Sequence, residues 1–417
     1  MAEATPELLK TADGRPLKAA LADAQLRAKR RAFLLVLPLL LFVLLTFLIP
    51  IGYMLKRSVE HDGFFASAPS TVAWFQANPY FDPANPPEAA FAALVEDLAR
   101  MQAEKNTGMA GTRVNYSVPG AISLFKAGAR AAKDLQPPYK EALIALDPDW
   151  GKPVLWRGMS SASGEYTTEF YKVAADRKLT EEGWARGDDG QRIYLYLFIK
   201  TFWVSGLITI ICLLLAFPVA HLLATLPMAK SSILMILVLL PFWTSLLVRT
   251  TSWIALLQEQ GIVNDLLTSI GLITDEGRLS MMYNLTGTVV AMTHVLLPFM
   301  ILPLYSVMKV IPPSYARAAR SLGATSWTTF RRVYLPQTLP GIAAGSLLVF
   351  ILAVGYYITP ALVGGADGQL ISNLISFHMT KSNWSLAAAI AGMLLAAILL
   401  LYWLYDQLVG IDRLKLG

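Results

Sequence analysis

The sequence predicts an all-α integral membrane protein with six transmembrane helices and a soluble, mainly helical extracytoplasmic insertion between the first two. Three observations predict it. The 417 residues are 55% hydrophobic and only 15% charged, a balance that is rare in soluble domains. No Asp or Glu occurs between Asp189 and Glu259, or between Glu276 and Asp367. Six apolar runs each reach the roughly 20 residues that a helix needs to cross a bilayer.

The chain begins with a polar segment, residues 1–31, which we expect to be cytoplasmic. The first apolar run, residues 32–55, is too long for a signal-peptide core and lacks a small-residue cleavage site. We therefore expect a retained transmembrane helix, with bends at Pro38 and Pro50 that neighbouring helices can accommodate.

Residues 56–197 form the insertion, whose length is that of a small domain. A helix is predicted from Pro86 to about Lys105, because Phe91, Leu94, Val95, Leu98 and Met101 share one of its faces. A second helix is expected over Tyr166–Val173. Three roles remain open for the insertion: packing or shielding, contact with a solute receptor, or a substrate pocket. Its aromatic residues suffice for a small core: Trp74, Phe75, Tyr80, Phe81, Trp150, Trp156, Phe170 and Trp184.

The core domain, residues 198–408, holds five further apolar runs, and residues 409–417 follow as a cytoplasmic tail. Because prolines interrupt these runs, several of the helices should be bent. The runs are Phe198–Leu226, Ser231–Trp253, Leu285–Met308, Gly341–Val363 and Leu386–Leu408, and the prolines are Pro218, Pro241, Pro298, Pro303 and Pro360.

Positive charge predicts the orientation of these helices. The net charge of +6 collects beside the apolar runs, so it indicates membrane orientation and not nucleic-acid binding. Loop 309–340 carries Lys309, Arg317, Arg320, Arg331 and Arg332, whereas loops 254–284 and 364–385 carry one basic residue each. We therefore expect both termini and loop 309–340 in the cytoplasm, and the insertion outside.

Loop 309–340 predicts two short helices joined by a bend. Ser314 suits the N-cap of the first helix, and Gly323 permits the bend because it has no Cβ. Ser326 is the expected cap of the second helix, which we expect Pro336 to end.

This loop resembles the EAA loop of binding-protein-dependent ABC importer permeases. The matching residues are Ala318, Ala319, Leu322, Gly323, Ala324, Phe330, Leu335, Pro336 and Pro340. The resemblance implies the type I ABC importer permease fold, with the loop as the coupling helix that docks on an ATPase subunit. It assigns ATPase coupling to Ser314, Arg317, Ala318, Ala319, Leu322, Gly323 and Ala324.

Arg317 stands where the family has Glu. A Glu there would complete a capping box with Ser314 and oppose the helix dipole favourably, and Arg317 does neither. Two interpretations stay open: Arg317 meets a carboxylate on the ATPase, or it is a solvated arginine.

Further strings are similar to the spermidine/putrescine branch of these permeases: Leu240–Arg249, Leu296–Met300 with Pro303–Ser306, and Gly364–Ala366. The branch implies an inner-membrane permease for a polyamine, an opine or a related small cation. It also implies three partners: an ABC ATPase dimer, a second permease, for which the resemblance favours a different chain, and a periplasmic solute-binding protein. ATP and Mg²⁺ would bind to the ATPase; this chain has no Walker motif, so we expect no cofactor or catalytic residue on it.

A path for a cation can use aromatic faces, because cation–π contacts contribute about 0.5–2 kcal/mol. The candidates are Trp243, Tyr305, Tyr356 and Tyr357, with Glu259 and Asp367 at the external mouth. Each also has an ordinary interpretation, as an interfacial aromatic or a solvated carboxylate. Arg249 either reaches the external surface or braces a partner's carboxylate, and His221 and His294 are expected to bond to neighbouring helices.

Other functions remain as alternatives. They are an ABC permease for another small solute, a secondary transporter, and an enzyme or sensor built on the insertion. Secondary transporters usually carry intramembrane ionisable pairs, and the missing carboxylates disfavour that class. The single cysteine, Cys212, excludes a disulfide or a cysteine metal site within the chain, and no metal site is expected.

Overall fold

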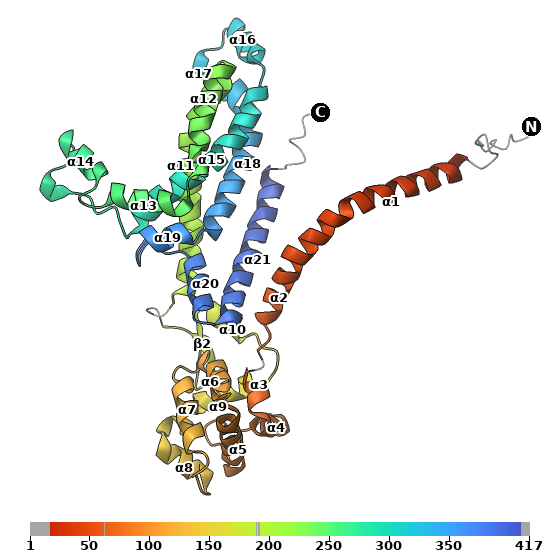
Figure 1. Ribbon diagram of the computed structural model, residues 1–417, viewed down its shortest axis with the longest axis vertical. Helices are drawn as coiled ribbons and strands as arrows, with labels where there is room; N and C mark the ends of the chain where they lie inside the picture. Colours follow the sequence, from red (N-terminus) through yellow and green to blue (C-terminus); the bar gives the residue numbers. More distant parts are fainter. Residues whose placement is uncertain (1–16, 62, 189, 191, 410–417) are drawn as a thin grey trace, which may run out of the picture. The chain divides into compact units, whose positions relative to one another are not determined.

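The computed structural model describes residues 17–61, 63–188, 190 and 192–409 (Figure 1). Residues 1–16 of the predicted N-terminal segment and 410–417 of the predicted tail lie outside the described residues, whereas residues 17–31 are helical. The chain divides into two compact units, Met1–Arg57 and Ser58–Gly417.

The first unit is a helical rod made of α1 (Leu17–Val43), a π turn η1 (Leu44–Leu48) and α2 (Ile49–Arg57). Its segment Ala24–Arg57 is long and apolar enough to cross a membrane, as predicted for residues 32–55. Pro38 lies inside α1, and Pro50 is the second residue after the π turn, a local widening that can absorb a missing N–H donor.

The second unit begins with a helical lobe that corresponds to the predicted insertion. It contains one antiparallel hairpin, in which Arg177 pairs with Arg186 and Thr180 with Gly183. Its elements are α3 (Gly63–Ser67), α4 (Pro69–Ala77), α5 (Glu88–Glu104), α6 (Thr107–Asn115), α7 (Ala121–Ala131), α8 (Tyr139–Leu146), η2 (Pro148–Gly151), α9 (Pro153–Ala162), α10 (Glu169–Ala174), β1 (Arg177–Thr180) and β2 (Gly183–Arg186).

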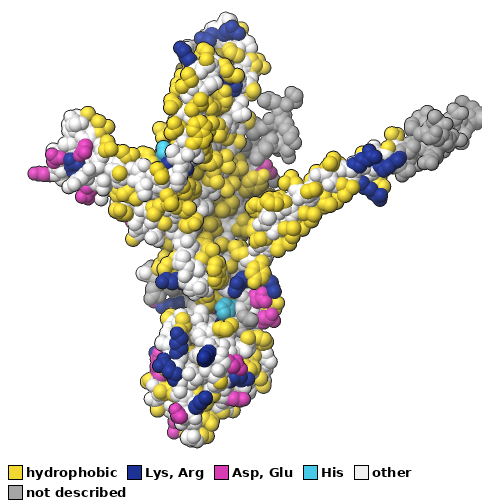
Figure 2. All heavy atoms as spheres, in the orientation of Figure 1, with side chains coloured by type: hydrophobic (Ala, Val, Ile, Leu, Met, Phe, Trp, Pro, Cys, Tyr) yellow, Lys and Arg dark blue, Asp and Glu magenta, His cyan; other side chains and the backbone are white. Residues whose placement is uncertain are grey.

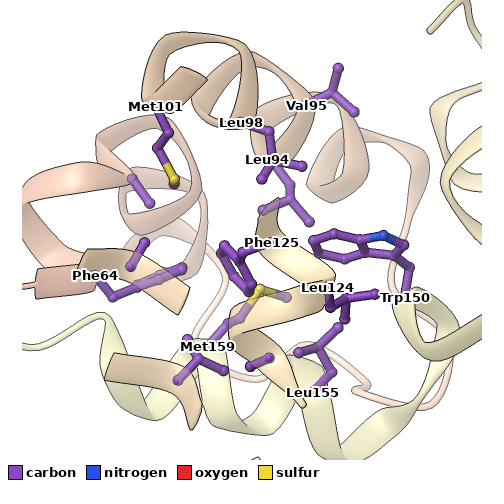
Figure 3. Close-up of a cluster of buried hydrophobic side chains, with 14 of the residues drawn as sticks. Phe64, Leu94, Val95, Leu98, Met101, Leu124, Phe125, Trp150, Leu155 and Met159 are labelled. Atoms are coloured by element: carbon purple, nitrogen blue, oxygen red, sulfur yellow. The ribbon is translucent and has the colours of Figure 1, made fainter. Parts of the chain in front are cut away.

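The lobe has a hydrophobic core of its own, which Figure 3 shows around the ring of Phe125. The predicted face of α5 supplies Phe91, Leu94, Val95, Leu98 and Met101, and all five are buried. Phe75, Trp150, Trp156 and Phe170 are buried as well, whereas Tyr80 is 98% exposed. The helical period of this segment therefore identified the core face correctly.

The lobe joins the membrane helices through α10, which is shorter than the predicted Tyr166–Val173 helix and starts later. Phe170 and Ala174 belong to a buried cluster with Leu197, Phe198, Ile390 and other side chains of the membrane helices. Asp176, buried and at φ 55°, accepts hydrogen bonds from the backbone N–H groups of Tyr194 (3.0 Å) and Leu195 (2.7 Å). A lobe residue thus caps the first long helix of the core.

Replacing Asp176 by Ala is expected to lower the free energy of unfolding by about 1–2 kcal/mol, the cost of a lost helix cap. Asp176→Asn is the comparison variant: Asn tolerates positive φ and keeps one of the two acceptor oxygens, so it should lose less stability than Ala. Denaturant unfolding of the full chain, followed by tryptophan fluorescence, measures both. Equal losses for the Ala and Asn variants would show that the cap does not act in this way.

The membrane core contains four uninterrupted spans, Tyr194–Thr225, Leu285–Val310, Ser326–Gly355 and Trp384–Gln407, and one bent helix pair. With Ala24–Arg57, the described residues hold five such helices, or six if the bent pair is one span. The elements of the membrane core are α11 (Tyr194–Thr225), α12 (Met228–Leu239), η4 (Leu240–Trp243), α13 (Leu246–Leu257), α14 (Ile262–Ser269), η5 (Asp275–Gly277), α15 (Leu285–Val310), α16 (Pro313–Ser321), α17 (Ser326–Thr329), η6 (Phe330–Tyr334), α18 (Leu335–Gly355), α19 (Ile358–Val363), α20 (Ile371–Thr380) and α21 (Trp384–Val409).

Two predicted runs are broken in the structure. Ser231–Trp253 is not one helix: Met228–Trp243 and Leu246–Ser269 meet at 97°. Pro241 lies in the 3₁₀ turn at the break, where its missing N–H ends the α-helical ladder. Gly341–Val363 likewise ends early, because α18 stops at Gly355 and α19 starts at Ile358. Pro218, Pro298 and Pro303, by contrast, lie inside continuous helices.

Candidate functional site

Loop 309–340, called here the coupling loop after the role that the resemblance implies, contains α16, and this helix starts earlier than predicted. Pro312 occupies the N-cap position and Pro313 the first turn, so Ser314 is inside the helix and is not its cap. The fixed φ of Pro313 suits the first helical position, where no N–H donor is needed. Arg317 is then too far along the helix for the capping-box argument to apply.

The end of α16 turns at Gly323, as predicted. Gly323 has φ 86°, its N–H donates to Arg320 O (3.0 Å), and the N–H of Ala324 donates to Ala319 O (3.1 Å). This is the Schellman pattern, which requires a left-handed residue after the helix. The family-like Leu-Gly-Ala string at residues 322–324 therefore has a local structural cause.

The second short helix differs from its prediction at both ends. Thr325, not Ser326, is its cap, since the Thr325 hydroxyl accepts from Thr328 N (3.2 Å). Pro336 does not end it, because the chain continues through η6 into α18 as one helical segment. The π turn Phe330–Tyr334, which ends two residues before Pro336, accommodates the missing donor.

The coupling loop is exposed and basic. Leu322 is 89% exposed, Trp327 68% and Tyr315 52%. Arg317, Arg320, Arg331 and Arg332 are exposed too, and Figure 2 shows Lys and Arg side chains at this end of the helices. Exposed large apolar side chains within a charged surface are typical of a protein-binding site.

Gly323→Ala is expected to impair the coupling loop without unfolding the chain. No atom lies within 4 Å of an added Cβ, so the cost is the left-handed backbone alone, about 1–2 kcal/mol. Relaxing that strain would turn α16 relative to α17; with the coupling role that the resemblance implies, this should lower transport-coupled ATPase activity of the complex. Gly108→Ala, inside α6 with equally open surroundings, is the control and should be neutral. A Gly323→Ala chain with wild-type coupling would contradict the account.

The aromatic path candidates occupy three places. Trp243, in η4, is 75% exposed. Tyr305 and Tyr356 are half-buried, and both pack against the cluster of buried apolar side chains that α11, α15 and α18 form. Tyr356 and Tyr357 form the break between α18 and α19, where their carbonyls accept from Ser372 Oγ (2.6 Å) and Asn373 Nδ2 (2.8 Å). The residues Gly355, Tyr357, Ser372, Ile375, Ser376, Met379, Thr380, Trp384 and Leu394 line a pocket of about 480 Å³ at this break.

The two mouth carboxylates have different surroundings. Asp367 is exposed and pairs with Lys200, whose Nζ lies 3.5 Å from its Oδ1. Lys200 itself is largely buried and stacks on the ring of Tyr196. Glu259 is exposed in the turn before α14, and its carbonyl accepts from Arg278 Nη1 (3.0 Å). The sequence offered no signal for the pairing of Asp367, since the partner lies 167 residues away.

The two intramembrane histidines bond to neighbouring helices, as predicted. His221 Nδ1 lies 2.9 Å from Tyr334 Oη, and Trp253 Nε1 donates to His294 Nδ1 (3.1 Å). Arg249 lies close enough to His294 and Tyr356 to interact with both electrostatically. The Trp253–His294 hydrogen bond joins the bent third run to α15.

A hollow on the inner side of the coupling loop was not predicted. Lys309, Arg317 and Arg320 face it together with His221 and Tyr334. Pro313, Ala316, Arg317 and Arg320 recur at the spacing of one helix face, which is the sequence signal that would have revealed it.

Several apolar spans, a bent span and a basic, exposed loop between two spans define a multi-pass membrane component. The family of binding-protein-dependent transport system inner membrane components matches residues 191–410. This match covers more than half of the chain, so the chain belongs to that family: it is a permease of a binding-protein-dependent ABC importer. The match begins after the lobe.

Individual relatives agree with the family. The spermidine/putrescine transport system permease protein PotB of Haemophilus influenzae is 36% identical over 222 residues, covering 51% of this chain and 77% of that protein. PotB of Escherichia coli K12 is 33% identical over 222 residues, covering 52% and 80%. A solved bacterial ABC transporter involved in alginate import overlaps 53% of this chain and 80% of that chain, with a TM-score of 0.42 and 20% identity.

Proposed function

We propose that this chain forms part of the translocation path for a small cationic solute, a polyamine, an opine or a related compound, delivered by a periplasmic binding protein. The observation that carries the proposal is the 36% identity to PotB, which extends over 77% of that permease. The chain's exposed aromatic residues support it, because aromatic faces attract organic cations without holding them tightly.

The proposed path runs along the breaks in the third and fifth apolar runs. Irregular backbone at membrane depth is tolerated where it lines a cavity, which suits Tyr356 and Tyr357 beside the 480 Å³ pocket. Tyr305 and Trp243 extend the aromatic series, and Glu259 and Asp367 would lie at the external mouth. Because Lys200 offsets Asp367, Glu259 is the stronger attractant of the two.

The proposed orientation places the coupling loop and both termini in the cytoplasm. The coupling loop contains Arg317, Arg320, Arg331 and Arg332. Loop 254–284, by contrast, carries Asp265, Asp275 and Glu276 and a single basic residue, Arg278. This charge asymmetry follows the positive-inside rule. The loop would then dock on an ABC ATPase, through Ala318, Ala319, Leu322, Gly323, Ala324 and the exposed start of α16 at Ser314.

The other partners follow from the same class of importer. ATP and Mg²⁺ would bind to the ATPase dimer, and a second permease, a different chain, would complete the path. For the lobe, a packing role is favoured, because α10 shares a buried cluster with the membrane helices.

The test is uptake into proteoliposomes that contain the complex purified through a tag on this chain, with its binding protein added outside. Labelled spermidine or putrescine should enter only when ATP is enclosed, and an excess of unlabelled polyamine should compete. Uptake driven by a proton gradient without ATP would support the secondary-transporter alternative instead. ATP-driven uptake that sulfate but no polyamine inhibits would reassign the solute.

A further inference from the structure

The hollow behind the coupling loop, called here the basic hollow, has a volume of about 530 Å³. Four elements build its wall: the end of α11, the end of α15, one face of α16 and the η6–α18 junction. The lining residues are His221, Ala224, Thr225, Met308, Lys309, Ile311, Pro312, Pro313, Tyr315, Ala316, Arg317, Arg320, Val333, Tyr334 and Gln337.

Three cations converge on the basic hollow, and no Asp or Glu lines it. Lys309 Nζ donates to the carbonyl of Ala224 (3.4 Å), and Arg320 Nε to that of Ala316 (3.3 Å). Within the part of the chain that the structure describes, no ion pair neutralises Lys309, Arg317 or Arg320. Three like charges around one cavity repel one another, and an anion inside it would remove that repulsion.

The remaining wall is apolar and lies at the ends of membrane spans. Met308, Ile311, Pro312 and Val333 contribute to it, and α11, α15 and the segment Ser326–Gly355 all have a span end here. The basic hollow thus lies where apolar helices leave the bilayer. Cations beside an apolar wall at this depth match a phospholipid, whose phosphate is charged and whose chains are not.

We propose that the basic hollow binds the phosphate-bearing headgroup of an anionic phospholipid of the inner leaflet. Arginine forks bind phosphate oxygens with two parallel hydrogen bonds, and Lys309 adds a point charge. The bound lipid ties α16 to the ends of α11 and α15, so it steadies the loop that meets the ATPase. The inference rests on the orientation stated under the proposed function, which makes this side the inner leaflet.

The experiment compares two double variants of the full complex by native mass spectrometry after detergent exchange, with phosphatidylglycerol or phosphatidylcholine supplied. Arg317→Gln/Arg320→Gln removes two charges that line the basic hollow, and Arg331→Gln/Arg332→Gln removes two charges of the same loop that do not line it; all four arginines are exposed. We expect the first variant to bind phosphatidylglycerol about 25-fold more weakly, roughly five-fold for each arginine, and the second to bind it as the wild type does. Arg317→Lys/Arg320→Lys, which keeps both charges, should retain most of the binding.

Three results would overturn the proposal. Equal lipid loss in both Gln variants would mean general surface attraction. Inorganic phosphate that displaces the lipid at millimolar concentration and stabilises the complex equally would make free phosphate the ligand. If the Arg317→Gln/Arg320→Gln complex lost its ATPase subunit but kept the lipid, the two arginines would bind an ATPase carboxylate and not the lipid. Lipid binding is scored without transport, so a complex that keeps the lipid but transports no polyamine fails the proposed function and not this inference.

Discussion

Leu322→Asp is expected to release the ATPase from this permease. Leu322 is 89% exposed and directly follows α16, beside the left-handed Gly323 that fixes its direction. An exposed leucine at the tip of a docking loop is a natural anchor for an apolar pocket on the partner. Loss of such an anchor costs about 2–4 kcal/mol, which weakens binding roughly 30- to 1000-fold. The measurement is co-purification of the ATPase with tagged permease.

The control for this experiment is Leu272→Asp. Leu272 is also an exposed leucine, 69% exposed, but it follows α14 and not α16. It should leave the ATPase attached, because it lies outside the coupling loop. Trp327→Asp, at the second exposed apolar position of the loop, should reproduce the Leu322 effect in part. If as much ATPase co-purified with the Leu322→Asp chain as with the wild type, the coupling loop would not be the ATPase-binding surface.

The second large effect is expected in the lobe, where Glu169→Gln should strongly destabilise the fold. Arg113 Nη1 lies 2.6 Å from Glu169 Oε2, and the two side chains are 0% and 2% exposed. Arg113 also lies 5.4 Å from the ring centroid of Phe170. Removing one partner leaves a charge buried without compensation, which costs about 3–5 kcal/mol. Denaturant unfolding of the full chain, together with protease resistance of the lobe, measures the loss.

Two further variants make this result specific. Lys152→Gln breaks the exposed Lys152–Asp149 pair and should leave stability unchanged, since exposed ion pairs contribute little. Arg113→Met/Glu169→Leu replaces both buried charges by apolar groups and should recover much of the loss. A Glu169→Gln chain as stable as Lys152→Gln would show that the buried pair is not important for the lobe.

The spacing of apolar side chains and the length of the apolar runs predicted two parts of the structure well. The apolar face of α5 and the existence of the apolar spans follow from side-chain spacing, which burial in a core or a membrane enforces directly. The bend at Gly323 was also predictable, because the left-handed position after a helix favours one residue type.

Features that depend on tertiary contacts were not predictable in the same way. Pro241 breaks its run while Pro298 does not, and the two positions look alike in sequence. The cap of α11 comes from Asp176 and the partner of Asp367 from Lys200, through contacts between distant segments. The basic hollow needs four elements at once, so its anion-binding character appears only in the folded chain.

The most direct test of the central claim is the accessibility of a cysteine placed in the coupling loop. Ser326→Cys provides it, because Ser326 is exposed while the native Cys212 is buried and should not react. In intact cells the new thiol should react only with a membrane-permeant maleimide, and in purified complex the ATPase should protect it. Labelling by an impermeant maleimide from outside the cell, or equal labelling with and without the ATPase, would contradict the account.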